Sequence, residues 1–391
     1  MMLTELARKF RDQERFATDY APLYARYFGT VAGWLEADDA AQDPLAQWLL
    51  QASAGRSPFS VTNTLAAGLH RDVLAQEPAA LPLARFYPTA GGNIDAPGFA
   101  DALRQVILAR QETLAAFIQT ANVQTNETGR GLAWLLPLRL TGWEAVHLVD
   151  LGASAGLNLL ADRRHFRLVN AQSGAPLLDL GAGEPEQFRV QVEGSSSGWL
   201  HPGLNLPPLP RILSRLGGDM HPFHLRSRAD ELRLMSFVWA DHVPRLQRLQ
   251  EGIAARQAFG GDFRLESLEM PAQLPHFLAT HITARHPHHP VVLYNTYMTT
   301  YLSDKGASLR QIIGDWAGDQ PHPVLWLQWE PPPPPIEPPA FGWCAWTADY
   351  WQQQTHHHHQ FGWVHPHGAH IIVESGEWQV GRSKGRGASG E

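Results

Sequence analysis

The chain has 391 residues, of which 44% are hydrophobic and 18% are charged, and its formal net charge is −7. This composition is typical of a globular protein large enough for two structural units, and the acidic balance argues against a general nucleic-acid-binding surface. The single cysteine, Cys344, excludes an internal disulfide. The N-terminus is charged and no apolar run approaches about 20 residues, so neither a signal peptide nor a membrane span is expected. We therefore expect a soluble, cytoplasmic protein.

Residues 1–140 are predicted to form a helical domain. Large apolar side chains recur there at helical spacing, which indicates the core of a helical bundle. The first of these side chains are Phe10, Phe16, Tyr20, Leu23, Tyr24 and Tyr27. Prolines and glycines between residues 81 and 92 interrupt the pattern, and a helix is predicted to resume over residues 99–118.

A polar segment, Val123-Gln-Thr-Asn-Glu-Thr-Gly-Arg130, leads into the apolar residues 132–140. If this segment begins a helix, Asn126 and Arg130 share one face, because residues four apart are neighbours on a helix. Glu127 is adjacent and is a candidate general base, provided that burial raises its pKa. The alternative is an exposed, capped helix start with an internal ion pair.

The clearest motif lies between residues 145 and 164. The apolar run Val146–Leu151 predicts a buried strand, and residues 157–164 predict a helix. Between them, Gly152-Ala-Ser-Ala-Gly156 contains only small side chains, which suit a tight turn. Such a turn directs backbone N–H groups and a helix N-terminus toward one place, which favours an anionic ligand.

Strands and helices alternate from residue 145 to residue 330, which indicates a mainly parallel sheet with crossover helices. Further strands are predicted near residues 188–193, 262–268, 291–295 and 324–329, and residues 211–219 are expected to form another element of the sheet region, for which the pattern does not separate helix from strand. Residues 341–373 are expected to add an antiparallel hairpin at the edge of this sheet.

Two segments interrupt or end this pattern. An insertion rich in Gly, Ser and Pro occupies about residues 165–210, within a domain of residues 141–380. In the helical stretch 230–253, Asp241 is expected to cap the second half. Residues 381–391 have the composition of a disordered tail.

Two chemistries use a turn of this kind. The pattern Asp150-x-Gly152-x-x-x-Gly156 resembles that of class I S-adenosylmethionine-dependent methyltransferases, in which the acidic residue accepts hydrogen bonds from the cofactor's ammonium group. The letters Gly-x-Ser-x-Gly around Ser154 are also those of a hydrolase nucleophile elbow. Several strands precede that elbow in α/β-hydrolases, whereas the residues that precede it here are predicted to be helical.

The chain contains 20 histidines, four of them consecutive at His356–His359. Because structural metal sites place distinct ligands on rigid elements, we expect this stretch, as a loop, to bind metal only adventitiously. No dedicated metal site is predicted.

Five stretches carry a likeness to a known family: Phe86–Gly92, Val123–Arg130, Asp150–Leu159, Leu232–Asp241 and Val291–Thr296. Together they resemble the bacterial family numbered 2332 among the domains of unknown function, over nearly the whole chain. Two residues depart from the family pattern: Asp150 stands where Glu is usual, and Ala240 stands where Pro is frequent.

The resemblance implies an α/β fold with a Rossmann-like, mainly parallel sheet of the class I methyltransferase type behind a helical N-terminal domain. By position in that fold, Asp219 would hold the ribose hydroxyls, provided that the insertion loops out. Asn295, after the fourth strand, would orient an acceptor and, with Glu127, is predicted to be catalytic. The predicted cofactor-binding residues are Asp150, Gly152, Ala153, Ser154, Gly156, Asn158, Asp219, Asn126 and Arg130.

The sequence thus favours an S-adenosylmethionine-dependent methyltransferase, or a protein that binds this cofactor, acting on an unknown and small-molecule acceptor. The alternatives are a serine esterase that uses Ser154 and a non-catalytic binding protein on a methyltransferase-like fold. Nucleic acid and membrane are not expected as partners, and the sequence does not indicate an oligomeric state.

Overall fold

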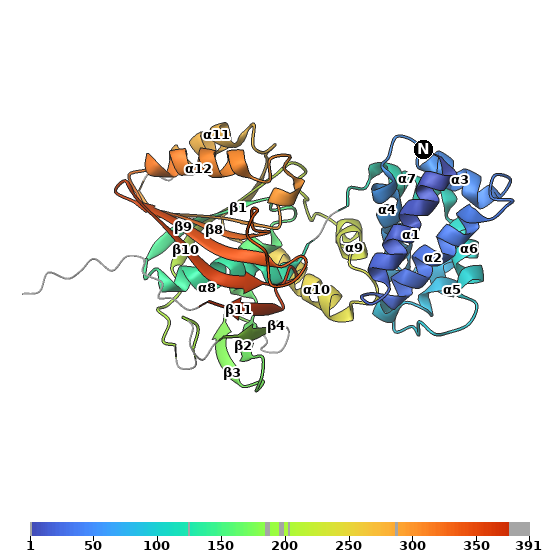
Figure 1. The fold of residues 1–391 in the computed structure, drawn as a ribbon, viewed down its shortest axis with the longest axis horizontal. Helices are drawn as coiled ribbons and strands as arrows, with labels where there is room; N and C mark the ends of the chain where they lie inside the picture. The colour runs from blue at the N-terminus through green and yellow to red at the C-terminus, as the bar shows by residue number, and fades with distance from the viewer. Residues whose placement is uncertain are drawn as a thin grey trace, which may run out of the picture. The chain divides into compact units, whose positions relative to one another are not determined.

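A computed structural model of the chain describes residues 2–123, 126–183, 188–194, 199–201, 204–285 and 288–374 (Figure 1). The chain forms two compact units. The first comprises Met1–Asn126 and Leu225–Gln250, and the second comprises Glu127–His224 and Glu251–Glu391. The sequence-based division at residue 140 therefore differs from these units, because residues 127–140 contact the sheet and residues 225–250 contact the helices of the first unit.

The first unit is helical, as predicted. Its helices are α1 (Leu3–Ala17), α2 (Pro22–Glu36), α3 (Pro44–Ala52), α4 (Pro58–Leu74), α5 (Leu81–Ala84), α6 (Phe99–Ala109), α7 (Gln111–Thr120), α9 (Arg228–Ser236) and the first part of α10 (Val243–Ala258). Proline occupies the first turn of α2, α3 and α4, where its missing N–H costs nothing. The side chains of Asp43 and Ser57 cap α3 and α4 by accepting backbone N–H groups.

The predicted bundle core is confirmed for most of its aromatic residues, but not for all. Phe10, Tyr24 and Tyr27 are buried, whereas Phe16 is 62% exposed and Tyr20 is 36% exposed. Phe16 follows Phe10 by six positions, and at roughly 3.6 residues per turn such a pair lies on different faces of one helix. The expectation that Phe16 and Tyr20 are core residues is therefore wrong.

Asp241 caps a different helix from the predicted one. Its Oδ1 accepts the backbone N–H of Leu23 at 2.8 Å, in the first turn of α2. The residue before α2, Ala21, has no side chain that can cap. Asp241 supplies the missing acceptor from a distant part of the first unit, which the local sequence pattern does not reveal.

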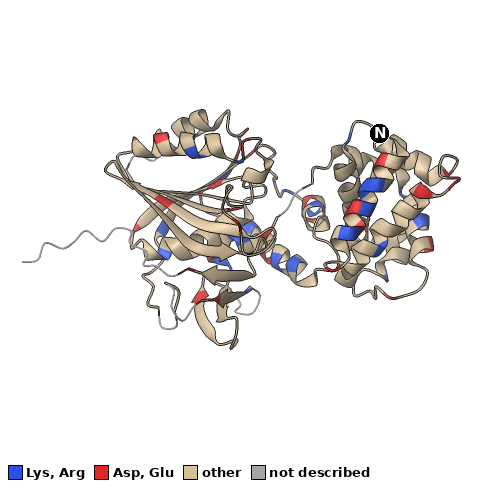
Figure 2. Ribbon diagram, in the orientation of Figure 1, with Lys and Arg blue, Asp and Glu red and all other residues tan. Residues whose placement is uncertain are grey.

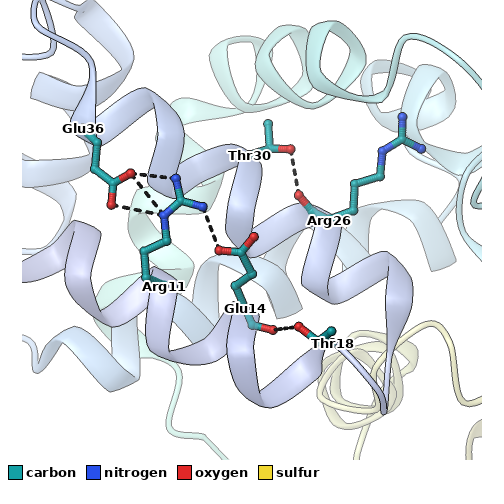
Figure 3. A network of polar contacts seen from close by, with 6 residues as sticks. All are labelled: Arg11, Glu14, Thr18, Arg26, Thr30 and Glu36. Carbon is teal, nitrogen blue, oxygen red and sulfur yellow. Dashed lines mark hydrogen bonds and ion pairs between the residues drawn. The ribbon is translucent and has the colours of Figure 1, made fainter.

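An ion-pair network joins α1 to α2 (Figure 3). The guanidinium of Arg11 donates to both carboxylate oxygens of Glu36 and, at 2.7 Å, to Glu14. The hydrogen bond from Arg11 lowers the pKa of Glu36. Charges of both signs alternate along α1, whereas the central strands of the second unit carry few (Figure 2).

Replacing Arg11 with alanine is expected to lower the free energy of unfolding only slightly. The side chains of Arg11 and Glu36 are 37% and 43% exposed, so solvent screens the pair and the expected loss is about 0.5–1 kcal/mol. Chemical denaturation measures it, with the exposed Arg8→Ala on the same helix as control. A loss of several kcal/mol from Arg11→Ala would show that the network has a larger role than its exposure implies.

The second unit is built on one sheet of eleven strands in the order β3-β2-β4-β11-β10-β9-β8-β7-β1-β5-β6. The strands are β1 (Ala145–Leu151), β2 (Phe166–Asn170), β3 (Pro176–Leu180), β4 (Arg189–Glu193), β5 (Arg211–Asp219), β6 (Phe263–Ser267), β7 (Val291–Thr296), β8 (Val324–Glu330), β9 (Cys344–Gln352), β10 (Thr355–Val364) and β11 (His370–Val373). The five neighbours β6, β5, β1, β7 and β8 are parallel, as predicted. Next to them, β9, β10 and β11 pair antiparallel in succession, whereas β4 pairs in parallel with both β11 and β2, and β3 pairs antiparallel with β2.

Apolar side chains cover both faces of the parallel strands. On β7, Val291 and Leu293 belong to one core, with α11 (Leu274–Phe277) and α12 (Ala307–Gly318). Val292 and Tyr294 belong to the other, with α8 (Leu132–Leu140). Figure 1 shows α11 and α12 on one side of the sheet and α8 on the other. This alternation explains why the parallel strands read as continuous apolar runs.

The predicted antiparallel hairpin exists, but the expectation that it forms the sheet edge is wrong. β9 pairs with β8, and β10 then pairs with β11. β11 pairs in turn with β4, which lies in the insertion of residues 165–210. The insertion thus covers the edge that the hairpin would otherwise expose.

None of the helices in the described ranges is both long enough and apolar enough to cross a bilayer.

Candidate functional site

The turn after β1 has an unusual backbone. Gly152, Ser154 and Gly156 all have positive φ angles, of 94°, 49° and 68°. Glycine adopts such angles without strain, whereas serine does so at a cost of order 1–3 kcal/mol. Gly156 precedes a short 3₁₀ helix, Leu157–Arg163, with a non-helical residue at Leu160. The expectation of a regular α-helix over residues 157–164 is therefore wrong.

Three of the N–H groups expected to face an anion are used within the protein. The amides of Gly152 and Ala153 both donate to the carbonyl of Gly218, at 2.8 and 3.2 Å. The amide of Ser154 donates to Oδ2 of Asp219 at 2.8 Å. These three N–H groups are therefore hydrogen-bonded within the protein, and the negatively charged group beside the turn is the carboxylate of Asp219.

The glycines of the turn permit close packing against neighbouring side chains. A Cβ on Gly152 would lie 2.8 Å from Cγ of Met298, and one on Gly156 would lie 2.6 Å from the ring of Phe263. Ala153, also in the predicted set, is buried and meets Gly217 of the adjacent strand. Larger side chains at these positions would force the turn away from the sheet.

Asp150 lies near the end of β1 and is buried, with 4% exposure. Its Oδ2 accepts the hydroxyl proton of Tyr294 at 2.7 Å, and Tyr294 is the donor to this carboxylate among the residues that the structure describes. Burial raises the pKa of Asp150 to about 7; the tyrosine hydrogen bond opposes this shift and the charge of Asp219 adds to it. A carboxylate with unused acceptor capacity therefore stands beside the turn.

Asp219 is the last residue of β5, the parallel neighbour of β1. Besides the amide of Ser154, its carboxylate accepts the amide of His221 at 2.8 Å. The long insertion forms β2, β3 and β4, which lie at the opposite edge of the sheet from β5 and β6. Asp150 and Asp219 consequently stand at the carboxyl ends of adjacent strands.

Asn295 lies near the end of β7 with no exposed surface, and both ends of its amide are used. Its Nδ2 donates to Glu330 at 2.7 Å, and its Oδ1 accepts the indole N–H of Trp326 at 2.6 Å. Glu330 also accepts the amides of Met298 and Thr299 and the hydroxyl of Thr299. Burial raises the pKa of Glu330. Asn295 and Glu330 thus hold the loop after β7 in place. The sequence alone did not indicate a role for Glu330.

The helix predicted for Asn126, Glu127 and Arg130 begins later than expected. Glu127 has an extended backbone, a 3₁₀ helix runs over Thr128–Gly131, and α8 follows. Asn126 and Arg130 therefore do not share a helix face. Nδ2 of Asn126 is buried and has no hydrogen-bond partner within the described ranges.

Glu127 and Arg130 are nevertheless both buried, with 3% and 7% exposure. Oε2 of Glu127 lies 3.2 Å from Nδ1 of His367, in the turn between β10 and β11. Nε of Arg130 donates to the carbonyl of Pro366 at 2.8 Å, and its guanidinium lies over the ring of Tyr297. The alternative of an exposed ion pair within this segment is excluded.

Asn158 links the turn to this second group of residues. Its Nδ2 donates to the carbonyl of Glu127 at 3.2 Å, and its own carbonyl accepts the indole N–H of Trp134 at 2.8 Å. The structure therefore brings the turn, Asn158, Glu127 and Arg130 into one region of the second unit.

The consecutive histidines form part of strand β10 rather than a loop, which corrects the expectation stated above. His356 and His358 point to one side and share Oδ1 of Asp349, at 2.8 and 2.9 Å. Among the described residues, no group of three or more His, Cys, Asp and Glu side chains is arranged to hold a metal ion.

A cleft of about 510 Å³ lies at the opposite end of the parallel strands. It is lined by residues at the amino ends of β1, β5 and β7: Trp143, Glu144, Ala145, Arg211, His289 and Pro290. In open α/β sheets, ligands bind at the carboxyl ends of the strands. The candidate site is therefore the edge that carries Asp150 and Asp219.

Comparison with known proteins identifies a family but no characterised relative. The model of a bacterial family described as "Uncharacterized protein conserved in bacteria (DUF2332)" matches residues 7–372. Neither the curated proteins nor the solved structures contain a significant match. Because the family model covers almost the whole chain, the chain belongs to this bacterial family.

Proposed function

We propose that the second unit binds S-adenosylmethionine at the carboxyl ends of β1 and β5 and transfers its methyl group to a small-molecule acceptor. The observation that carries the proposal is Asp150, a buried carboxylate with unused acceptor capacity beside the Gly152–Gly156 turn. Its charge would be neutralised by the ammonium group of the cofactor's amino-acid end.

The order of the parallel strands supports this site. If only these five parallel strands are counted in chain order, β1 is the first, β5 the second, β6 the third, β7 the fourth and β8 the fifth. Across the sheet they then follow the order third, second, first, fourth and fifth. The order reverses between β1 and β7, and such a switch point is where doubly wound sheets bind nucleotide-like ligands. Asp150 on β1 and Tyr294 on β7 meet there. The class I methyltransferase type of fold is part of the proposal.

The residues present fit the two polar ends of the cofactor. Asp150 would accept the ammonium group, and Asp219 retains acceptor sites for ribose hydroxyls besides its two backbone amides. The backbone of Gly152 is covered by Met298, so the cofactor would contact that side chain and not the bare turn. When bound, the cofactor supplies an electrophilic methyl group, and in-line positioning provides much of the catalysis.

A ligand series tests the proposal through thermal stability. At about 100 times its dissociation constant, a ligand stabilises the folded protein by about 2.7 kcal/mol, which corresponds to a rise in Tm of roughly 5–10 °C. S-adenosylmethionine and S-adenosylhomocysteine are expected to give this rise. 5′-Methylthioadenosine lacks the amino-acid end that Asp150 would bind and is expected to give less. Equal shifts for all three compounds would argue against the role of Asp150.

A serine hydrolase is the second candidate, and the φ angle of Ser154 favours it. A nucleophile elbow holds its serine in a strained turn at the end of a strand. Against it, β1 is the first strand in the chain, and a 3₁₀ helix replaces the helix of the elbow. A fluorophosphonate probe that labels Ser154 in the folded protein would favour the hydrolase, whereas our proposal expects no label.

A further inference from the structure

A carboxylate–imidazole pair lies at the same edge of the sheet as the candidate cofactor site. Nδ1 of His367 is 3.2 Å from Oε2 of Glu127. The two partners differ in accessibility, since Glu127 has 3% of its side chain exposed and His367 has 24%. Nδ1 itself is buried, and its approach to Oε2 of Glu127 is a close ion-pair contact rather than an aligned hydrogen bond. The exposed part of the ring is therefore the part that does not face Glu127.

Close backbone packing fixes the two segments that carry this pair. A Cβ on Gly129 would lie 2.8 Å from the carbonyl oxygen of His367, and one on Gly368 would lie 3.0 Å from the backbone of Gly129. Arg130 adds the hydrogen bond to the carbonyl of Pro366. The amide of His367 donates to Nδ1 of His365 at 3.2 Å. The imidazole is thus held by a rigid surround, which is what a positioned acid–base group needs.

The pair adjoins the switch point of the sheet. One guanidinium, that of Arg130, bridges the carbonyl of Pro366 and, at 3.4 Å, the carbonyl of Thr296 at the end of β7. On the other side, Asn158 joins the carbonyl of Glu127 to the segment that follows the Gly152–Gly156 turn. His367 therefore lies near the carboxyl end of β7, the strand that follows the switch point.

We propose that His367 is the acid–base residue of this site, that Glu127 positions it, and that the methyl acceptor is an O–H or N–H nucleophile. This inference rests on the proposed methyl transfer. With its proton on Nδ1, on the side that faces Glu127, the neutral ring carries its lone pair on Nε2. The nucleophilic atom attacks the methyl carbon, the carbon–sulfur bond breaks, and the bonding electrons remain on sulfur as a thioether. The acceptor's proton passes to Nε2, and Glu127 stabilises the resulting imidazolium.

The charged and titratable groups around His367 are consistent with this assignment. Glu127 is the acidic partner, Arg130 contributes a fixed positive charge through the same turn, and the ring of His365 lies 5.3 Å away. Glu127 was the candidate base from the sequence. Its contact with His367, whose ring is the more exposed of the two side chains, gives it the positioning role instead.

Imidazole nitrogen NMR of the full chain tests the pair without any knowledge of the acceptor. The signal of His367, assigned by its loss in His367→Gln, is expected to show the Nδ1–H tautomer, and Glu127→Gln is expected to remove that preference. His370 and Glu193 form a matched control: their atoms are 2.9 Å apart, but Glu193 is 47% exposed, so Glu193→Gln should leave His367 unchanged. An Nε2–H tautomer at His367 in the unaltered protein would overturn the proposal.

Methyl transfer from radiolabelled S-adenosylmethionine to a panel of phenols, carboxylic acids, primary amines, tertiary amines and thioethers tests the role in catalysis. His367→Gln is expected to lower transfer by about 10²–10⁴-fold and to abolish the acidic limb of the pH profile, where protonation of the base lowers the rate, while the cofactor-induced rise in Tm persists. Unchanged transfer in His367→Gln, or transfer only to acceptors without a proton on the nucleophilic atom, would overturn it. Failure of the proposed function would appear differently, as no rise in Tm with the cofactor in the unaltered protein.

Discussion

Replacing Glu330 with alanine is expected to lower the free energy of unfolding by about 3–5 kcal/mol, because four buried donors lose their acceptor. These donors are Nδ2 of Asn295, the backbone amides of Met298 and Thr299, and the hydroxyl of Thr299, all within 3.0 Å of the carboxylate. Each buried polar group left without a partner costs about 1–3 kcal/mol. Chemical denaturation followed by tryptophan fluorescence measures the loss.

Two further variants separate this network from a general effect of altering a glutamate. Glu330→Gln keeps one acceptor oxygen but turns an NH₂ group toward the donors, so an intermediate loss of about 1–3 kcal/mol is expected. Glu337→Ala removes an exposed glutamate in the loop after β8 and should change stability by less than about 0.5 kcal/mol. Similar losses for Glu330→Ala and Glu337→Ala would contradict the network.

Asp150→Asn is expected to change how the free energy of unfolding depends on pH, because Asp150 is a buried carboxyl group with a strongly raised pKa. In the folded protein, the pKa of Asp150 is raised to about 7, whereas in the unfolded chain the carboxyl group titrates near its usual value of about 4. Between these values the folded state binds a proton that the unfolded state has lost. Stability therefore falls as pH rises through this interval, and the penalty is complete above pH 7.

Asparagine does not titrate, and its Oδ1 still accepts the hydroxyl of Tyr294. Between pH 5 and pH 8, Asp150→Asn is therefore expected to gain about 2–3 kcal/mol relative to the unaltered protein. The same variant is expected to bind S-adenosylmethionine about 10–100-fold more weakly, because it lacks the charge that faces the ammonium group. Denaturation at both pH values measures the first effect, with the exposed Asp315→Asn on α12 as control. Parallel pH profiles for Asp150→Asn and the unaltered protein would contradict a buried, titrating Asp150.

Features with a local signal could be predicted from the sequence. The apolar runs of β1 and β7, the small residues of the Gly152–Gly156 turn and the helices of the first unit all follow from neighbouring residues. The place of Asp219 beside the turn followed from strand order, once the insertion was assumed to loop out.

Features that depend on distant partners could not be predicted. Tyr294 and Asp150 are 144 positions apart, and Glu127 and His367 lie near opposite ends of the second unit's sequence. No spacing in the sequence marks such pairs. In the short 3₁₀ helix after the turn, the carbonyl of Asn158 accepts the indole N–H of Trp134, from a preceding helix, instead of a local amide. Tertiary contacts of this kind override local helix propensity.

The candidate site combines two strand-end carboxylates that the sequence anticipated with a carboxylate–imidazole pair of which it indicated only Glu127. Asp150 and Asp219 come from strand ends that the alternation of elements predicts. His367 comes from the turn between β10 and β11, which Arg130 links to the end of β7. Glu330 holds the loop after β7, and this loop places Met298 against Gly152 of the turn.

Calorimetric titration of the full chain with S-adenosylmethionine at pH 8 tests the central claim most directly. Asp150 is ionised at this pH, so binding of one cofactor per chain is expected, and the affinity should fall when the titration is repeated at pH 6. Folded protein that takes up no S-adenosylmethionine at millimolar concentration, at either pH, would contradict the proposed function.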